Sequence, residues 1–280
     1  MTCRNCGAEL SGEFCAACGQ RAAEPDPTLR ELLHELAEEL LHWDGKLGST
    51  FRLLVQRPGA LTTAYLAGRR VRFISPLRLY LTCSVLYFAL SALTPSPLRV
   101  TTTVGGIGGA SGTVGDTTVA LASLDTLAKH GRWLGRVWGV HFASAIKRRD
   151  ELKHAIANAV PKLMFVLVPI FAALVGLVYR SRRRRYPQHL AFALHVHAFL
   201  FLALSVMLLR RVVPGGALQA AIALTGSLII AWYFARAARV VYGGSRAATI
   251  GRAAVIASTY LATFALTMSL SIGLIILLQF

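Results

Sequence analysis

Four of the five cysteines in this 280-residue chain lie within its first 18 residues, and their spacing is typical of metal ligands. They form two Cys-x2-Cys pairs in the stretch CRNCGAELSGEFCAACGQ, with Cys3 and Cys6 in one pair and Cys15 and Cys18 in the other. A glycine follows each pair and permits a tight turn, so that backbone N–H groups can approach the sulfurs. Four thiolates that converge tetrahedrally suit Zn²⁺, and iron in a rubredoxin-like site is the alternative.

A metal-binding module of this length cannot bury enough apolar surface to fold by itself, so the bound metal must stabilise it. We therefore predict a zinc ribbon over residues 1–24 that holds one structural Zn(II) ion. Four protein thiolates leave no open coordination position, which argues against a catalytic metal. The ribbon is either a purely structural element or a docking module for a cytoplasmic protein partner.

The apolar stretch HLAFALHVHAFLFL contains a second group of residues that could bind a ligand or transfer a proton, the histidines His189, His195 and His197. On a helix that advances about 100° per residue, His195 and His197 point to nearly opposite sides, so this helix alone cannot offer both to one ion. They are either buried imidazoles that hydrogen-bond to neighbouring helices, or part of a proton relay or ligand site. The expected contacts are small polar residues on the last apolar segment, which complete this candidate intramembrane polar site: Thr259, Thr263 and Thr267.

The distribution of acidic residues restricts the chemistry further. No Asp or Glu follows Glu151, so the apolar segments downstream contain no carboxylate. This argues against zinc proteases, carboxylate di-iron oxygenases and carboxylate-driven proton transporters. The sequence therefore leans against an enzyme and predicts no catalytic residue.

The elements that must position these residues are apolar segments of membrane-spanning length. Hydrophobic residues make up 55% of the chain and charged residues only 15%, against roughly 25% charged residues in soluble proteins. Five segments are long enough to cross about 30 Å of hydrocarbon, and they cover residues 77–94, 161–179, 190–209, 217–235 and 254–278. We therefore predict an all-α membrane protein with a helical membrane domain over residues 77–280, in which the loop 95–160 is extracytoplasmic.

Residues 25–76, between the ribbon and the first span, are predicted to form amphipathic helices. One begins at Thr28, which has the pattern of a capping box with Glu31. A second, shorter helix follows over about residues 47–54 and ends before a proline. Both are expected either to lie on the membrane surface or to pack against the helical bundle.

The arginines beside the spans are distributed asymmetrically, and this predicts the orientation. If the N-terminus is cytoplasmic, thirteen arginines flank the spans on that side, and only Arg210 and Arg211 lie in the short loop opposite. The ribbon then has reduced thiols, and the C-terminus is extracytoplasmic. Because the net charge of +17 is concentrated beside the spans, it predicts contact with anionic lipid at the cytoplasmic face and no nucleic-acid partner.

Three stretches together resemble one family of bacterial inner-membrane proteins: CRNCGAELSGEFCAACGQ, AYLAGRRVRFISPLRLYL and YPQHLAFALHVHAFLFL. That family is a domain of unknown function with an N-terminal zinc ribbon. The resemblance implies that the chain resides in a bacterial inner membrane. It also implies that His189, His195 and His197 form a membrane-embedded family motif, HxxxxxHxHAF, but it implies no activity.

Three functions remain open at this point. The leading hypothesis is a non-enzymatic interaction or envelope-regulatory protein whose cytoplasmic zinc ribbon engages a protein partner. The second is a small-solute or proton transporter or channel that uses His195 and His197. The third is a membrane enzyme that acts on lipid. The lack of carboxylates in the later spans weakens the second hypothesis, and the lack of a recognisable catalytic set weakens the third.

Overall fold

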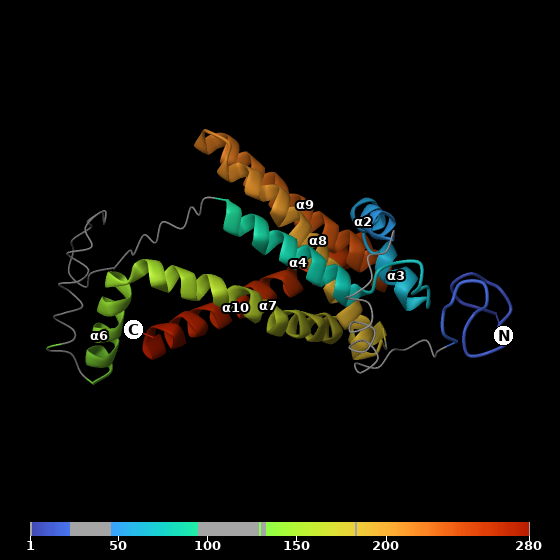
Figure 1. The fold of residues 1–280 in the computed structure, drawn as a ribbon, viewed down its shortest axis with the longest axis horizontal. Coiled ribbons are helices and arrows are strands. Elements are labelled where there is room, and N and C mark those ends of the chain that lie inside the picture. The colour runs from blue at the N-terminus through green and yellow to red at the C-terminus, as the bar shows by residue number, and fades with distance from the viewer. Residues whose placement is uncertain (1, 23–45, 95–128, 130–132, 183, 280) are drawn as a thin grey trace. The chain divides into compact units, whose positions relative to one another are not determined.

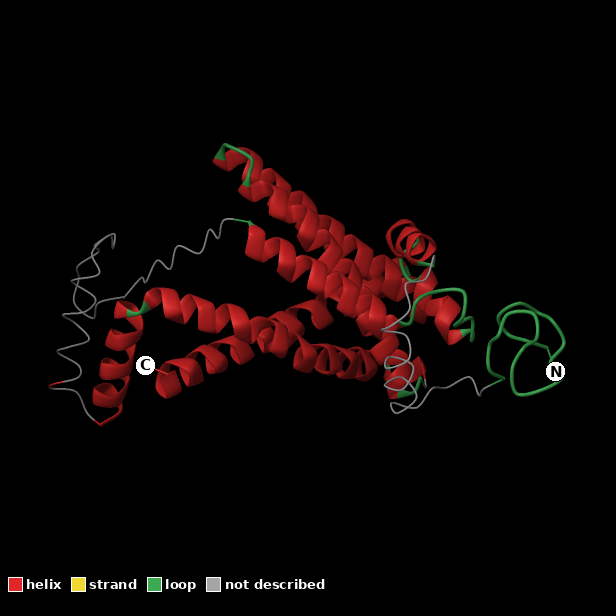
Figure 2. Cartoon of the chain, in the orientation of Figure 1, coloured by secondary structure: helices red, strands yellow, loops and turns green. Residues whose placement is uncertain are grey.

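The computed structural model describes residues 2–22, 46–94, 129, 133–182 and 184–279. Over these residues the fold is all-α, as predicted, and extended pairing is limited to two isolated bridges, Thr2–Glu9 and Phe14–Arg21 (Figure 2). The helices, labelled in Figure 1, are α2 (Leu47–Gln56), α3 (Ala60–Leu66), α4 (Pro76–Leu93), α6 (Trp133–Lys147), α7 (Arg149–Val178), η1 (Arg180–Arg182), α8 (Tyr186–Met207), η2 (Leu208–Arg211), α9 (Gly216–Tyr242) and α10 (Arg246–Gln279).

Five of these helices are long and apolar enough to cross a membrane, which is the predicted number. They are α4, α7 from Asp150, α8 continued by η2, α9 and α10. Two of them start well before the predicted spans, because α7 begins at Arg149 and α10 at Arg246. Hydropathy detects only the apolar part of a helix, whereas the backbone hydrogen bonds continue through polar turns at its ends.

Local sequence signals account for several helix ends. A proline lies in the first turn of α4 and of α8, where it lacks an N–H that would have no partner and has a φ angle suited to a helix. At the other end of α9, Gly243 adopts a positive φ of 70°, and its N–H bonds to the Arg239 carbonyl. Glycine favours that conformation and so ends the helix.

The chain divides into two compact units. The first comprises Met1–Ser96 with Val166–Leu261, and the second comprises Pro97–Phe165 with Ala262–Phe280. This division passes through α7 and α10, so it follows packing and not the boundaries of the predicted domains. Those boundaries stay predictions, and both the predicted helix at Thr28 and the first part of the loop 95–160 lie outside the described residues.

Helix α8 forms the centre of the first unit. Within its most apolar window, 56% of the residues are buried inside the protein, against 6% for α9. It packs most extensively against α4, beside which it runs in Figure 1. There the Phe201 ring is surrounded by the rings of Tyr80, Tyr87 and Phe88, at centroid distances of 5.6–5.7 Å. Because His195 and His197 point to opposite sides of α8, both can have partners only if α8 is central.

The short helices α2 and α3 pack against this bundle. For α2 this is one of the two arrangements expected from the sequence, whereas α3 was not predicted. The Tyr233 hydroxyl of α9 donates a hydrogen bond to the Leu54 carbonyl of α2 over 3.0 Å. Gly59, the residue before α3, has φ +82°, and a Cβ there would lie 2.9 Å from the Ala237 carbonyl oxygen. Only glycine allows this close approach, so Gly59 permits α3 to pack against α9.

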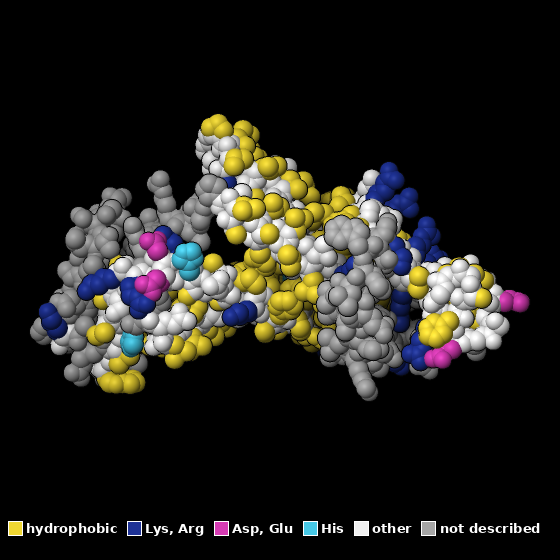
Figure 3. Space-filling view, in the orientation of Figure 1, with side chains coloured by type: hydrophobic (Ala, Val, Ile, Leu, Met, Phe, Trp, Pro, Cys, Tyr) yellow, Lys and Arg dark blue, Asp and Glu magenta, His cyan; other side chains and the backbone are white. Residues whose placement is uncertain are grey.

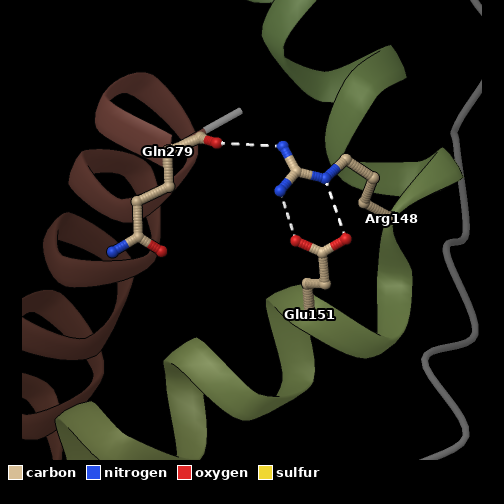
Figure 4. Close-up of polar contacts among 3 residues, drawn as sticks. All are labelled: Arg148, Glu151 and Gln279. Atoms are coloured by element: carbon tan, nitrogen blue, oxygen red, sulfur yellow. Dashed lines mark hydrogen bonds and ion pairs between the residues drawn. The ribbon is translucent and has the colours of Figure 1, made fainter.

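The second unit contains α6, the start of α7 and the end of α10. Arg148 joins two of these elements, because it forms an ion pair with Glu151 and donates to the Gln279 carbonyl over 3.3 Å (Figure 4). The Trp138 ring of α6 lies against Gly273 of α10, where a Cβ would be 3.5 Å from the ring. These contacts join the helix ends that the sequence predicts to be extracytoplasmic.

Candidate functional site

The four cysteines of the N-terminal ribbon converge. Their sulfur atoms all lie within 4.8 Å of one another, with Cys6–Cys15 at 3.5 Å and Cys3–Cys18 at 3.6 Å. In a tetrahedral Zn–S4 site with bonds of about 2.3 Å, neighbouring sulfurs are roughly 3.8 Å apart. The sulfurs can therefore hold a metal ion with little rearrangement.

Hydrogen-bond donors around Cys3 and Cys18 favour their thiolates. Gly7 and Gly19 adopt positive φ angles of 80° and 72°, and their N–H groups bond to the carbonyls of Cys3 and Cys15 over 2.8 Å. Backbone hydrogen bonds from Cys6 and Asn5 lower the pKa of the Cys3 thiol. The Asn5 side chain and the Gln20 backbone likewise lower the pKa of Cys18 to about 6. At Cys6 a backbone hydrogen bond from Ala8 lowers the pKa, but hydrogen bonds with Cys15 and Cys18 outweigh it and raise the pKa to about 12. Because the thiolate is the form that binds metal, the backbone donors favour metal binding at Cys3 and Cys18.

The ribbon is attached to the turn that follows α3. The side-chain amide of Gln20 donates to the Gly68 carbonyl over 2.7 Å, and its oxygen accepts from the Arg70 N–H over 3.2 Å. Gly68 has φ +81°, and a Cβ there would lie 3.0 Å from the Arg4 side chain. Elsewhere on the ribbon, Phe14 keeps 57% of its surface accessible.

His197 of α8 is held by two hydrogen bonds. Its Nδ1 lies 2.8 Å from the Ala193 carbonyl oxygen, which can only accept, so Nδ1 carries the proton. In the neutral ring Nε2 then accepts from the Tyr260 hydroxyl of α10 over 2.9 Å. The Phe171 ring of α7 meets both rings edge to face, at 5.0 Å from His197 and 4.9 Å from Tyr260.

His195 faces the other side of α8 and contacts a different helix. Its Nδ1 lies 3.0 Å from the Thr62 hydroxyl of α3, and both residues are buried. The Tyr65 ring, also of α3, approaches edge to face at 6.4 Å. The other ring nitrogen, Nε2, is buried and has no hydrogen-bond partner among the residues that the structure describes.

His189 lies near the start of α8 in an aromatic stack. Its Nδ1 is 2.8 Å from the Tyr242 hydroxyl, and the two rings are nearly parallel. The Tyr179 ring also stacks on Tyr242, at a centroid distance of 4.3 Å. Gly176 allows this packing, since a Cβ there would lie 3.2 Å from the imidazole. The Arg184 guanidinium lies 5.5 Å from the Tyr242 ring centroid, in a cation–π contact.

The three histidines therefore occupy three separate environments within the first unit. Neighbours on both flanks of α8 confirm that His195 and His197 face the bundle interior on opposite sides. The last span contacts His197 through Tyr260. Thr267 bonds to the carbonyl of Thr263 in its own helix, and the role of Thr259, Thr263 and Thr267 as a polar site stays a prediction.

Sequence reasoning missed the partners Thr62, Tyr242 and Tyr260. Two of these are tyrosines in helices that can cross a membrane, and a buried tyrosine hydroxyl needs a hydrogen-bond partner. That need was a signal available from the sequence. Thr62 carried no such signal, because α3 has only seven residues and its insertion beside α8 depends on Gly59.

A family model described as "Protein of unknown function (DUF3667)" matches residues 44–88. The matched segment contains α2, α3 and most of α4. It therefore includes Thr62, the hydrogen-bond partner of His195. Neither the curated proteins nor the solved structures contain a match to the chain.

Proposed function

We propose that this chain is a multi-pass protein of a bacterial inner membrane whose cytoplasmic ribbon binds one structural Zn(II) ion and engages a protein partner. It acts without catalysis, as an interaction or envelope-regulatory protein. The observation that carries this proposal is the way in which the ribbon is attached to the helical bundle. Gln20 attaches one aspect to the turn after α3, while Phe14 is exposed elsewhere on the module.

The position of Phe14 favours docking over a purely structural role. A large apolar side chain that is 57% exposed stabilises the ribbon little, but it suits the buried centre of a protein interface. The nearby Glu13–Arg21 ion pair is exposed as well, so it contributes little to stability. Both features are explained if this surface is covered by another protein.

The proposed orientation, with the N-terminus cytoplasmic, rests on the arginine distribution. Thirteen arginines beside the spans would then meet anionic lipid at the cytoplasmic face, against two on the other side. Reporter fusions test this placement. Fusions after Arg184 and Ser245 should report a cytoplasmic location, and a fusion after Val213 should report the opposite side. A cytoplasmic signal after Val213, with extracytoplasmic signals after Arg184 and Ser245, would overturn the orientation.

Site-specific cross-linking in cells tests the docking proposal. A photoreactive amino acid in place of Ala16, which is exposed on the ribbon, should yield one defined adduct with a protein. Phe14→Ser should abolish that adduct while zinc content stays the same. Glu9→Gln, a change at another exposed ribbon position, should retain it. An adduct equally strong in both variants would contradict docking through Phe14.

A second candidate function, a proton or small-solute transporter or channel, is favoured by one observation. The Nε2 atom of His195 is buried without a hydrogen-bond partner in the described part of the chain. Such a group lowers the stability of the fold by about 1–3 kcal/mol, which a role in binding a proton or a solute would explain. Uptake or proton flux in reconstituted vesicles tests this candidate. Flux that His195→Phe abolishes, while His197→Phe spares it, would favour transport over docking.

A further inference from the structure

An arginine-lined pocket lies between α2 and the segment that leads into α4. It has a volume of about 770 Å³, and its lining includes Ser49, Arg52, Gln56 and Arg57 on one side and Arg72 with Phe73 on the other. Ser49, Arg52 and Gln56 are spaced three and four residues apart, so they share one face of α2. Two chain segments thus bring three guanidinium groups to one cavity.

The charge of this pocket is not compensated by the residues that the structure describes. Its lining contains no acidic side chain, and none of the ion pairs in the described residues involves Arg52, Arg57 or Arg72. All three arginines are exposed at the cavity. Figure 3 shows Lys and Arg side chains gathered over α2 and α3. Converging cations that have no counter-ion within the described ranges attract an anion.

We propose that this pocket binds a phosphate-bearing ligand. The planar guanidinium fork matches two oxygens of a phosphate group, and three forks can share the oxygens of one phosphate ester. Ser49 and Gln56 add uncharged hydrogen-bonding groups. The Arg72 guanidinium lies 5.8 Å from the Phe73 ring, a cation–π contact that restrains it beside the cavity.

The pocket also offers an apolar wall, supplied by Leu53 and Phe73. Phe73 lies shortly before Pro76, where a helix able to cross a membrane begins. The cavity is therefore suited to an amphipathic phosphate ester such as an anionic lipid headgroup, and a soluble phosphate ester offers the same chemistry. Every residue of the lining falls within the segment 44–88 that matches the family of unknown function.

Binding to the purified full-length protein in a zwitterionic detergent tests the proposal. The probes are short-chain phosphatidylglycerol, inorganic pyrophosphate and, as the neutral control, short-chain phosphatidylcholine. The triple variant Arg52→Gln, Arg57→Gln, Arg72→Gln should weaken binding of the preferred anion by about tenfold or more. The matched variant Arg180→Gln, Arg236→Gln, Arg246→Gln removes three exposed arginines outside the pocket and should retain affinity.

The two anionic probes distinguish the ligand's source. Binding of phosphatidylglycerol alone identifies a lipid headgroup, and binding of pyrophosphate as well identifies a general phosphate site. Equal weakening in both triple variants would mean that net charge alone attracts the probes, and this would overturn the proposal. Failure of the native protein to bind either anion would overturn it too. Neither result depends on a partner of the ribbon, because only purified protein is used.

Discussion

The four cysteines and the three membrane histidines show opposite uses of residues that can bind metals. The cysteine sulfurs converge from two backbone turns to within 4.8 Å of one another. The histidines share one helix, yet each has a separate hydroxyl partner, Thr62, Tyr242 or Tyr260. Convergence requires turns that fold the chain back on itself, whereas one straight helix distributes its side chains around its axis. Residue type alone therefore indicates neither site.

The largest expected effect is loss of metal from the ribbon. The native protein should contain about one zinc per chain, and Cys15→Ser with Cys18→Ser should remove it, because structural zinc supplies about 10–16 kcal/mol to such modules. Elemental analysis of purified protein measures this. His195→Gln with His197→Gln is the matched control and should leave zinc content unchanged. Zinc lost from the histidine variant would break the contrast between the two groups.

The next largest effect concerns the contact that places Thr62 beside His195. Gly59→Ala introduces a Cβ 2.9 Å from the Ala237 carbonyl oxygen at a positive φ, so it should destabilise the protein by about 1–3 kcal/mol. Gly48→Ala is the control, since a Cβ there meets no atom within 4 Å. Unfolding in mixed micelles measures both. Equal stability of the two variants would mean that α3 does not depend on this close approach.

A smaller effect is expected at His197 and Tyr260. His197→Phe and Tyr260→Phe each remove the same hydrogen bond, so their effects on the free energy of unfolding should not add. The coupling between them should be about 0.6 kcal/mol, and at most about 1.7 kcal/mol, as for other hydrogen bonds between membrane helices. A double-mutant cycle measures it. Additive effects would show that the two residues are independent.

The smallest net effect is expected at His195. His195→Phe loses the bond to Thr62 but also removes the buried Nε2, which lacks a partner among the described residues. An unpaired buried group costs about 1–3 kcal/mol, so the two changes should nearly cancel. The same unfolding assay should show a smaller loss of stability than for His197→Phe. A larger loss would indicate that Nε2 has a partner that stabilises the fold.

Sequence patterns predicted the parts of this molecule that depend on local spacing. The Cys-x2-Cys pairs identified the convergent cysteines, hydropathy predicted five long helices, and helical geometry separated His195 from His197. The partners of the histidines could not be read in the same way. Tyr260 is 63 residues from His197, and Thr62 is 133 residues from His195, so both contacts depend on tertiary packing.

The pocket of arginines illustrates the same limit. In the sequence Arg72 is one of the thirteen arginines that support the predicted orientation, and nothing in the pattern links it to Arg52 or Arg57. Their convergence at one cavity requires the turn through residues 67–75 to bring Arg72 back beside α2. That return depends on packing of the buried Ile74, whose N–H donates to the Thr50 hydroxyl over 3.3 Å.

X-ray absorption at the zinc edge of the purified, zinc-loaded protein tests most directly whether the cysteines form one metal site and the histidines none. The cysteine cluster predicts a single shell of four sulfur ligands at about 2.3 Å. The separate partners of the three histidines predict no imidazole ligand. A mixed shell with nitrogen at about 2.0–2.1 Å would show that a histidine binds the ion, and it would contradict the account.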